Sequence, residues 1–282
     1  MMDADSNRVL SLDQAARYRS DGYLHVPQLV SRFDISRVKA MIYRLYRSAV
    51  PNDKELDQLE APWDTERFDQ KLATFRERDR STFGALYDSA QNNIATVRML
   101  LSEDAIQACA DALAESPENL SCSGLLLRMD PPHDKRNVLE WHQDRAFFPQ
   151  NFDGSNGVVL TILMSDTDEN MGALEICPRS HTEKYHPPKL EEKKDYTTSE
   201  QRTIDADLVK KYPTVNAVGA LGDAYLLHMN TFHRSGENQS ARIRFSAIMR
   251  FHRMFADDYV PYRWVEKFNE NVRNKIDTKF AS

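Results

Sequence analysis

The stretch NGVVLTILMSDTDENMGALEICPRSH, residues 156–181, contains two short runs of β-forming residues with a polar segment between them. Residues 158–165 (VVLTILMS) form the first run and residues 172–178 (GALEICP) form the second. Runs of this length, bounded by Gly, Pro, Asn and Asp, are typical of β-strands joined by turns. Gly172 and Pro178 are interpreted as turn residues. The stretch therefore predicts two short strands of a larger β structure.

Further runs of the same kind flank this stretch, at residues 122–129, 138–144, 224–229 and 242–251. Several short strands at such spacing favour a β-sandwich or jelly roll over a parallel sheet built from βαβ units. We therefore expect a mainly β fold with flanking helices. Its jelly-roll core should span residues 121–255, followed by a C-terminal tail over residues 256–282.

Residues 1–120 look mostly helical, and we expect them to form a flank of the β core within one domain of residues 1–282. Ser11 and Gln14 form a capping-box pattern, and Gly22 is a typical residue after a helix end. The next residues, YLHVP, predict a strand. Apolar periodicity predicts further helices, one that ends before Pro51 and two more at about 83–100 and 103–115.

Residues 184–213 form a long, highly charged interruption between the predicted strands. Long insertions in compact domains are usually either functional or disordered. We expect this segment to be a lid that orders over a substrate, although a solvated surface loop would have the same composition.

The bulk composition limits the possible functions. The chain has 282 residues, a formal net charge of −6 and three widely spaced cysteines without a CxxC pair, so neither a disulfide framework nor a thiolate metal site is predicted. The acidic balance argues against a nucleic-acid partner. No signal peptide and no run of some 18 apolar residues is visible, so we expect a soluble, cytoplasmic protein without a membrane partner. The oligomeric state stays open.

A second stretch, LEWHQDRAFFPQ at residues 139–150, places His142 and Asp144 among apolar and aromatic residues. Burying an ionised group without a partner is costly, so a metal ion is one candidate for what compensates them. The pattern alone is weak, because 8 His and 43 Asp or Glu give about one such pair by chance. On a strand, however, residues i and i+2 project from the same face and can bind one ion. The similar pair His181 and Glu183 follows Pro178 in a loop and is interpreted as a polar turn.

A third candidate ligand, His233, lies 91 residues after His142. Two histidines and one carboxylate on one face of an octahedron leave three open positions, as in iron(II) oxygenases. Arg244 lies eleven residues after His233 and could bind a carboxylate with both arms of its guanidinium, and Ser246 on the same strand face could donate to that carboxylate. Arg242 and Arg250 share this face and could form structural salt bridges.

Other residues with suggestive chemistry are interpreted as structural. His228 lies in the run YLLHM and is predicted to be a hydrogen-bonded core histidine, because a ligand is already available five residues later. His25 and His252 are interpreted in the same way. Trp141 should face away from His142 and pack in the core.

In four segments the sequence resembles the phytanoyl-CoA dioxygenase-like (PhyH) family of iron(II)- and 2-oxoglutarate-dependent oxygenases. They are YRSDGYLHVPQLVS (18–31), WHQD (141–144), the stretch 156–181 and HRSGENQSARIR (233–244), in this order. The resemblance implies a double-stranded β-helix fold. It also implies that His142, Asp144 and His233 bind iron(II), that Arg244 binds the distal carboxylate of 2-oxoglutarate, and that dioxygen is the second co-substrate.

Residues 121–132, SCSGLLLRMDPP, depart from the family pattern. Relatives often have a glutamine and a lysine there that help to bind 2-oxoglutarate. The residue that contacts the proximal carboxylate is therefore left unassigned.

The resemblance also implies the reaction: decarboxylation of 2-oxoglutarate to succinate is coupled to hydroxylation of an unactivated C–H bond. A desaturation or a rearrangement could follow from the same chemistry. Asp144 favours these outcomes over halogenation, because related halogenases have a small residue in its place. Two alternatives remain: a zinc-dependent hydrolase, which could use the same two histidines and carboxylate, and a jelly-roll binding module without catalysis, which would keep the strands and lose ligands. The hydrolase would not require Arg244.

Two arginines beside the predicted ligands indicate the substrate class. Arg145 follows Asp144 and Arg234 follows His233, so both could lie at the rim of the site and bind an anion. Phe147 or Phe148 could wall off the carbon that is oxidised. We therefore expect a small polar metabolite with an anionic group, not a long acyl-CoA. The alternative is that both arginines form surface ion pairs.

Overall fold

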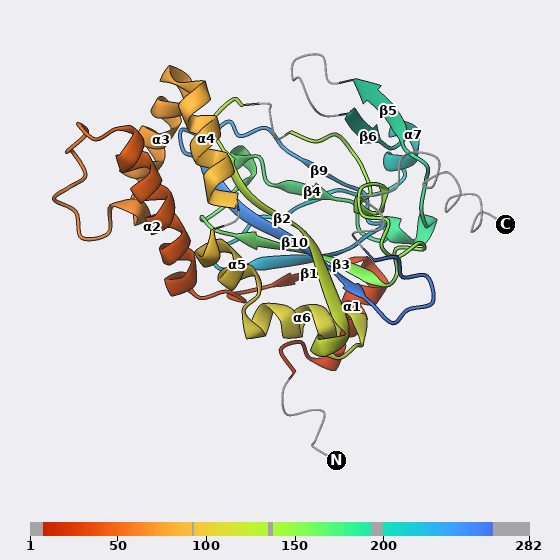
Figure 1. Cartoon of the computed structure of the whole chain (residues 1–282). Helices are drawn as coiled ribbons and strands as arrows, with labels where there is room; N and C mark the ends of the chain where they lie inside the picture. Colours follow the sequence, from red (N-terminus) through yellow and green to blue (C-terminus); the bar gives the residue numbers. More distant parts are fainter. Residues whose placement is uncertain (1–7, 92, 135–137, 193–199, 262–282) are drawn as a thin grey trace.

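The computed structural model describes residues 8–91, 93–134, 138–192 and 200–261. Figure 1 shows the helices α2, α3 and α4 on one side of the strands, and the hairpin β5–β6 with α7 on the opposite side. The helices are α1 (Leu12–Asp21), α2 (Arg32–Ala49), α3 (Glu66–Arg78), α4 (Arg80–Gln91), α5 (Ile94–Leu100), α6 (Glu103–Leu113) and α7 (Ala206–Val209). The strands are β1 (Tyr23–Val26), β2 (Leu120–Asp130), β3 (Gly157–Leu163), β4 (Leu174–Ile176), β5 (Lys189–Glu192), β6 (Glu200–Thr203), β7 (Val215–Asn216), β8 (Ala224–His228), β9 (His233–Ser235) and β10 (Arg244–Arg253).

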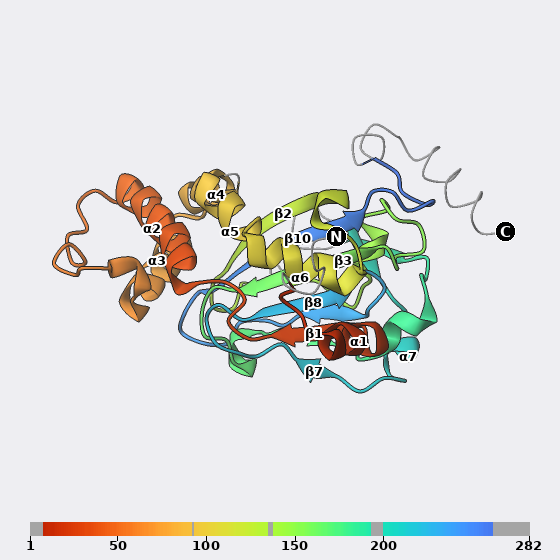
Figure 2. The ribbon, with the colours of Figure 1, turned by 90° about the horizontal axis from the view of Figure 1, so that it is seen from below.

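The strands form two antiparallel sheets and a separate hairpin. The major sheet has the order β1-β8-β3-β10-β2, and the minor sheet has the order β7-β4-β9. Figure 2 shows α5 and α6 on one side of the major sheet and β7 on the other. This arrangement confirms the predicted jelly roll with a helical flank. None of the helices in the described part of the chain is long and apolar enough to cross a membrane.

The alternation of side chains along β10 creates two different surfaces. Phe245, Ala247 and Met249 pack with the helices in the larger hydrophobic core, whereas Ile248 packs between the two sheets. Successive residues of a strand point to opposite faces. The even-numbered residues of β10 therefore lie on the face that is turned toward the space between the sheets, and these are Arg244, Ser246, Ile248, Arg250 and His252.

The N-terminal flank follows its capping signals closely. Ser11 and Gln14 form both hydrogen bonds of a capping box, and Gly22 ends α1 with a φ of 76°. The predicted helix over 83–100 is divided into α4 and α5, because the Asn93 side chain accepts from the Ala95 N–H and starts a new helix. Helix α3 was missed, because its sequence is highly charged and only a narrow stripe that includes Phe68 and Leu72 is buried.

The prediction of a strand over 138–144 is wrong. His142 forms a single antiparallel bridge with His233, and the short 3-10 helix η3 (Asp144–Ala146) begins two residues later. The chain turns there because the Arg145 N–H donates to the Met229 carbonyl, while the Phe147 N–H donates to the Asp144 carbonyl. Tertiary contacts have overridden the local strand pattern.

The charged segment 184–213 also contains more regular structure than its composition suggests. It includes the antiparallel hairpin β5–β6 and the short helix α7. Residues 193–199 within it, and residues 262–282 of the predicted tail, lie outside the described residues.

Candidate metal centre

Three predicted ligands meet between the two sheets. The Nε2 atoms of His142 and His233 each lie 3.5 Å from the Asp144 Oδ1 atom, and all three side chains are at most 6% exposed. In the described residues, this is the one group of His, Cys, Asp or Glu side chains that could hold a metal ion. The bridge to β9 positions both histidines, and the turn at η3 brings Asp144 back toward them.

Backbone carbonyls fix the orientation of both imidazole rings. Nδ1 of His142 lies 2.7 Å from the Glu140 carbonyl oxygen, and Nδ1 of His233 lies 2.9 Å from the Thr231 carbonyl oxygen. Because a carbonyl can only accept, each Nδ1 carries the proton and donates it. Each Nε2 faces the carboxylate, and an imidazole oriented through Nδ1 in this way is the usual arrangement of metal-binding histidines.

The protonation states also suit a metal. Burial lowers the pKa of His142, and the neighbouring His233 lowers it further. Burial alone would raise the pKa of Asp144, but Arg250 and the two histidines outweigh it and hold that pKa well below its usual value. The site thus has an ionised carboxylate and a neutral His142, the forms that bind metal ions.

The dimensions fit a small divalent cation. Ligand atoms at right angles around an ion with bonds of about 2.1 Å lie about 3 Å apart. The observed separations of 3.5 Å need only a small contraction to reach this value. Two imidazole nitrogens and one carboxylate oxygen are a donor set suited to iron(II), with further positions open.

The Asp144 carboxylate has one more partner, which the sequence alone did not assign. Arg250 Nε donates to Asp144 Oδ2 at 2.8 Å. The sequence contained one signal for this contact, because Arg250 lies on the same face of β10 as Arg244.

Arg244 lies in a separate cluster of buried charges. Its Nη2 donates to Asp130 Oδ2 at 2.6 Å, and Arg128 Nη2 lies 3.2 Å from the same oxygen. Arg128 also donates to Ser235 Oγ at 2.7 Å, and Ser246 lies directly across from Arg128 in the sheet. Sequence reasoning did not assign Arg128 or Asp130, because it gave no register between β2 and β10.

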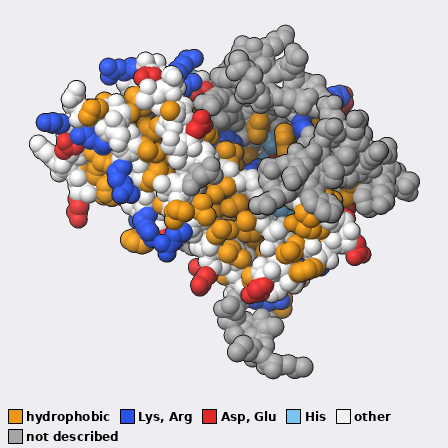
Figure 3. Space-filling model, in the orientation of Figure 1, with side chains coloured by type: hydrophobic (Ala, Val, Ile, Leu, Met, Phe, Trp, Pro, Cys, Tyr) orange, Lys and Arg blue, Asp and Glu red, His pale blue; other side chains and the backbone are white. Residues whose placement is uncertain are grey.

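The aromatic residues after Asp144 lie on different sides of the centre. The Phe147 ring packs edge-on against His142, with centroids 5.6 Å apart. The Phe148 ring lies under the Arg250 guanidinium at 4.3 Å. Figure 3 shows a depression on the face of Figure 1 in which histidine, hydrophobic and Lys or Arg side chains are visible.

Arg145 is buried, with its guanidinium between the rings of Phe152 and Tyr185 at 4.9 and 4.7 Å. Its Nε donates to the Phe152 carbonyl. The structure therefore places the Arg145 guanidinium against two aromatic rings, next to Asp144 in the chain.

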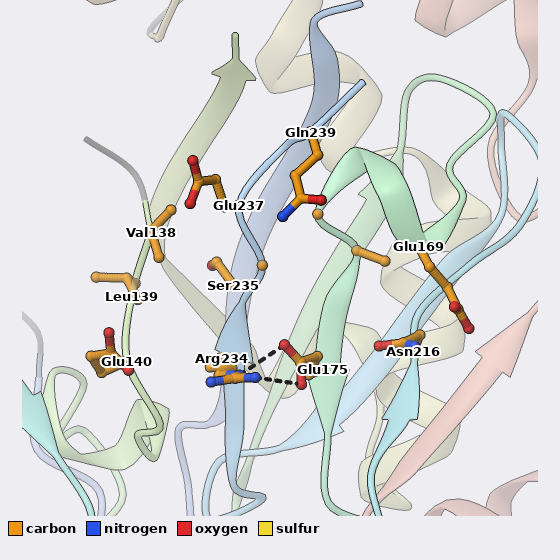
Figure 4. A pocket seen from close by; sticks show the side chains of 13 residues that line it. Val138, Leu139, Glu140, Glu169, Glu175, Asn216, Arg234, Ser235, Glu237 and Gln239 are labelled. Atoms are coloured by element: carbon orange, nitrogen blue, oxygen red, sulfur yellow. Dashed lines mark hydrogen bonds and ion pairs between the residues drawn. The ribbon is translucent and has the colours of Figure 1, made fainter. Parts of the chain in front are cut away.

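Arg234 lies on the opposite face of β9 from His233. Figure 4 shows it paired with Glu175, through two hydrogen bonds of 2.8 and 2.9 Å. Its guanidinium also stacks on Trp141, which lies against the small core cluster around Phe232. This pair lines a pocket of about 450 Å³. The structure does not bring Arg234 to the three predicted ligands.

The histidines that were interpreted as structural have protein partners. His228 accepts from the Asn230 N–H, and His25 lies 2.9 Å from an Asp223 oxygen. His252 bridges Ser123 and Asn151.

The pair His181 and Glu183 does not form a joint site. His181 contacts the Arg19 carbonyl, whereas Glu183 accepts from the Tyr212 hydroxyl.

An antiparallel jelly roll with this buried His-Asp-His cluster is typical of the class of non-haem iron(II) oxygenases. The profile of the family described as phytanoyl-CoA dioxygenase (PhyH) matches residues 18–246, and the chain belongs to this family. The protein is accordingly an oxidoreductase of the dioxygenase type.

Among the curated relatives, a probable alpha-ketoglutarate-dependent hypophosphite dioxygenase of Stutzerimonas stutzeri is 29% identical over 132 residues, which cover 46% of this chain and 45% of the relative. The peroxisomal phytanoyl-CoA dioxygenase of Bos taurus is 26% identical over 283 residues, which cover 96% of this chain and 76% of the relative. The match thus spans about half of the first relative and three quarters of the second.

Solved structures share the fold at low identity. The epimerase SnoN in complex with Fe3+, alpha ketoglutarate and nogalamycin RO has a TM-score of 0.59 and 18% identity, with 92% of this chain and 90% of that chain covered. EctD from S. alaskensis with bound Fe has a TM-score of 0.58 and 16% identity, with 89% and 79% covered.

Proposed function

We propose that His142, Asp144 and His233 bind iron(II), and that the enzyme hydroxylates an unactivated C–H bond of a small polar metabolite with an anionic group. The observation that carries this proposal is the convergence of two Nε2 lone pairs on one carboxylate oxygen in a buried site. Iron bound there would activate dioxygen with 2-oxoglutarate as the source of electrons. The residues of the protein would bind the iron and the co-substrate, orient the substrate, and exclude water.

The cluster around Arg244 is the proposed site for the distal carboxylate of 2-oxoglutarate. Two arginines, Arg128 and Arg244, both contact the Asp130 carboxylate, so two guanidinium groups lie close together there. Two neighbouring guanidinium groups in a buried site can bind a carboxylate through charge-assisted hydrogen bonds. Ser246 lies on the same interior face of β10 and could donate to that ligand. We assign no residue to the proximal carboxylate.

Arg145 is the proposed contact for the anionic group of the substrate. It directly follows Asp144, is held between two aromatic rings, and has a rigid fork that suits an anion. Phe147, which packs on His142, is the proposed wall beside the oxidised carbon, with Phe148 the alternative. Arg234 was expected to share the anion, and that role stays a prediction. In the structure its guanidinium is paired with Glu175.

The relatives point to two substrate classes. One is named for hypophosphite, a small anion, and others are named for phytanoyl-CoA, a long acyl thioester. The buried Arg145 favours the small anion.

Residues 184–213 are the proposed lid. Arg202 donates to the Ala146 carbonyl and lies over the Phe147 ring at 5.2 Å, so this segment contacts the residues next to the metal centre. The Gln143 side chain, between two ligands in sequence, binds the backbone of Lys184 and His186. If protease cleavage of the segment is unchanged by saturating iron(II), 2-oxoglutarate and substrate, the lid proposal fails.

The experiment that tests the class is anaerobic addition of iron(II) and 2-oxoglutarate to the purified protein. We expect a weak visible charge-transfer band of an iron-bound keto acid, and succinate release on admission of oxygen. A zinc-dependent hydrolase or a binding module would show neither. Coupled succinate release over a panel of small phosphonates, hypophosphite, carboxylates and acyl-CoA thioesters then tests the substrate class, and an acyl-CoA as the best substrate would contradict it.

A further inference from the structure

The two oxygens of the Asp144 carboxylate have different partners. Oδ1 faces the two imidazole Nε2 atoms at 3.5 Å, whereas Oδ2 accepts a hydrogen bond from Arg250 Nε at 2.8 Å. Asp144 is 1% exposed and Arg250 is 8% exposed, so water competes little for either group. The carboxylate is thus held from the side opposite to the histidines.

The guanidinium of Arg250 is itself held at two further points. Its Nη1 donates to the Gly124 carbonyl at 2.9 Å, and its plane lies over the Phe148 ring at 4.3 Å. Three contacts on one planar group fix its position and direction, which a flexible ammonium could not reproduce.

A local irregularity in β2 creates the space for this arrangement. Across from β10, Ile248 pairs with Leu126 and Arg250 pairs with Ser123, so β2 contains one extra residue at this point. Gly124 lies in this bulge with a φ of 63°, a left-handed conformation that glycine adopts without strain. A Cβ atom at Gly124 would lie 2.4 Å from the Phe148 ring, so a larger residue would displace the ring beneath Arg250.

We propose that Arg250 is a positioning residue of the metal centre: it binds Asp144 Oδ2, fixes the direction of the carboxylate, and leaves only Oδ1 for the metal. This inference rests on the proposed function of Asp144 as an iron ligand. One oxygen from Asp144 leaves three of six octahedral positions for the co-substrates, whereas a carboxylate that bound through both oxygens would leave two.

Two effects of Arg250 on metal affinity oppose each other. Its positive charge repels a divalent ion nearby, so its removal would tighten metal binding if charge alone mattered. Its contacts hold Asp144 in place, so its removal would weaken metal binding if orientation matters more. Loss of a partner that orients a ligand typically costs 10–100-fold in metal affinity. We infer that orientation dominates, because Arg250 is itself fixed by the Gly124 carbonyl and the Phe148 ring and so holds the Asp144 carboxylate in one direction.

The test uses the full-length protein with Co(II) alone as the probe, under anaerobic conditions. Arg250→Met should weaken Co(II) binding by about 10–100-fold and change its visible absorption, because the coordination number changes. Arg250→Lys keeps the charge and should recover part of the affinity. Gly124→Ala keeps Arg250 but disturbs the Phe148 ring, and should weaken binding in the same direction by a smaller factor.

Arg253→Met is the matched control, because Arg253 is on the same strand and pairs with Glu115 away from the site. It should leave Co(II) affinity and spectrum unchanged. If Arg250→Met does not fold, Arg250→Lys and Gly124→Ala carry the test. Unchanged or tighter Co(II) binding with an unchanged spectrum in the folded Arg250 variants would overturn the inference, whereas no Co(II) or iron(II) binding by the wild-type protein would instead overturn the proposed function.

Discussion

Strand β10 carries two buried arginine–aspartate pairs six residues apart, and they differ in what surrounds them. Arg244 pairs with Asp130 at 2.6 Å, and Arg250 pairs with Asp144 at 2.8 Å. Both pairs face the space between the sheets. The residue types and distances are therefore nearly the same, so neither distinguishes the functions of the two pairs.

The neighbours distinguish them. Arg128 adds a second guanidinium group beside the first pair, because it also contacts Asp130. Burial lowers the pKa of Arg244, Asp130 opposes this shift, and Arg128 adds to it. The second pair instead faces two imidazoles whose Nε2 lone pairs point at Asp144. The first cluster suits an anion, and the second suits a metal cation.

The largest effect should come from removing a ligand at the second pair. We expect Asp144→Ala, His142→Ala and His233→Ala each to lose iron(II) binding and turnover by more than about 100-fold, because loss of a direct ligand should exceed the loss of a residue that only orients one. Anaerobic iron(II) titration and succinate release measure this. Asp130→Ala, at the first pair, is the control and should keep iron(II) binding. Full activity of any ligand variant at low iron would remove that residue from the site.

The first pair should respond to 2-oxoglutarate instead. Loss of a buried charge-assisted contact costs about 2–5 kcal/mol, so Arg244→Ala should raise the KM for 2-oxoglutarate by about 30-fold or more. The KM for the substrate should change far less.

Arg242→Ala is the control for this variant, because Arg242 pairs with the exposed Glu66. An unchanged KM for 2-oxoglutarate in Arg244→Ala would move the carboxylate site to another arginine.

The sequence predicted the faces of these residues but not their partners. The two-residue period of a strand places Arg244, Ser246 and Arg250 on one face of β10. Whether Arg244 meets Asp130, or Arg250 meets Asp144, depends on the register with β2 and on the turn at η3. Register depends on turn geometry and on packing between distant segments, and the local residue pattern of one sequence does not reveal it.

Local chemistry explains what was predictable elsewhere. Helix α1 was predicted because Ser11, Gln14 and Gly22 act within one helix. Residues 138–144 were predicted as a strand because their pattern fits one, and the contact of Arg145 with the Met229 carbonyl, 84 residues later, decided otherwise. The three predicted ligands were assigned from the sequence because the segments that contain them resemble the family in order and spacing.

His252, two residues after Arg250 on β10, is buried, and this predicts an acid sensitivity. Burial, with a further contribution from Arg250, lowers the pKa of His252 to about 3. The unfolded chain takes up this proton below a pH of about 6.5, whereas the folded protein takes it up only near pH 3. Stability is therefore lost as the pH falls through this range.

His252→Gln can keep hydrogen bonds to Ser123 and Asn151 but removes the titration. We expect the free energy of unfolding, measured with urea, to fall by roughly 2 kcal/mol less in this variant than in the wild type when the pH is lowered from 6.5 to 4.5. Part of the loss of stability in acid should remain, because burial also lowers the pKa of His228, to about 4. His133→Gln, at an exposed histidine, is the control. An identical acid dependence in His252→Gln and the wild type would contradict the prediction.

The smallest effect is expected at Asp130, and it concerns the competition for Arg244. In this structure Asp130 Oδ2 occupies the arm of Arg244 that would bind the distal carboxylate of 2-oxoglutarate. Asp130→Asn removes the competing charge and keeps the shape, so the KM for 2-oxoglutarate should fall about three-fold, which corresponds to less than 1 kcal/mol. The thermal midpoint without 2-oxoglutarate should also fall, because two buried arginines lose their shared counter-ion.

Saturating 2-oxoglutarate should restore part of this thermal midpoint, because a ligand that binds only the folded state stabilises it. Asp134→Asn is the matched control, since Asp134 forms a similarly buried pair with Arg76. It should lower the midpoint without changing the KM for 2-oxoglutarate or gaining stability from it beyond the wild type. If Asp130→Asn instead raises the KM, Asp130 aligns Arg244 for the co-substrate and does not compete with it. The two pairs would then work in a similar way, because in each pair one residue holds the other in place for a ligand: Asp130 holds Arg244, and Arg250 holds Asp144.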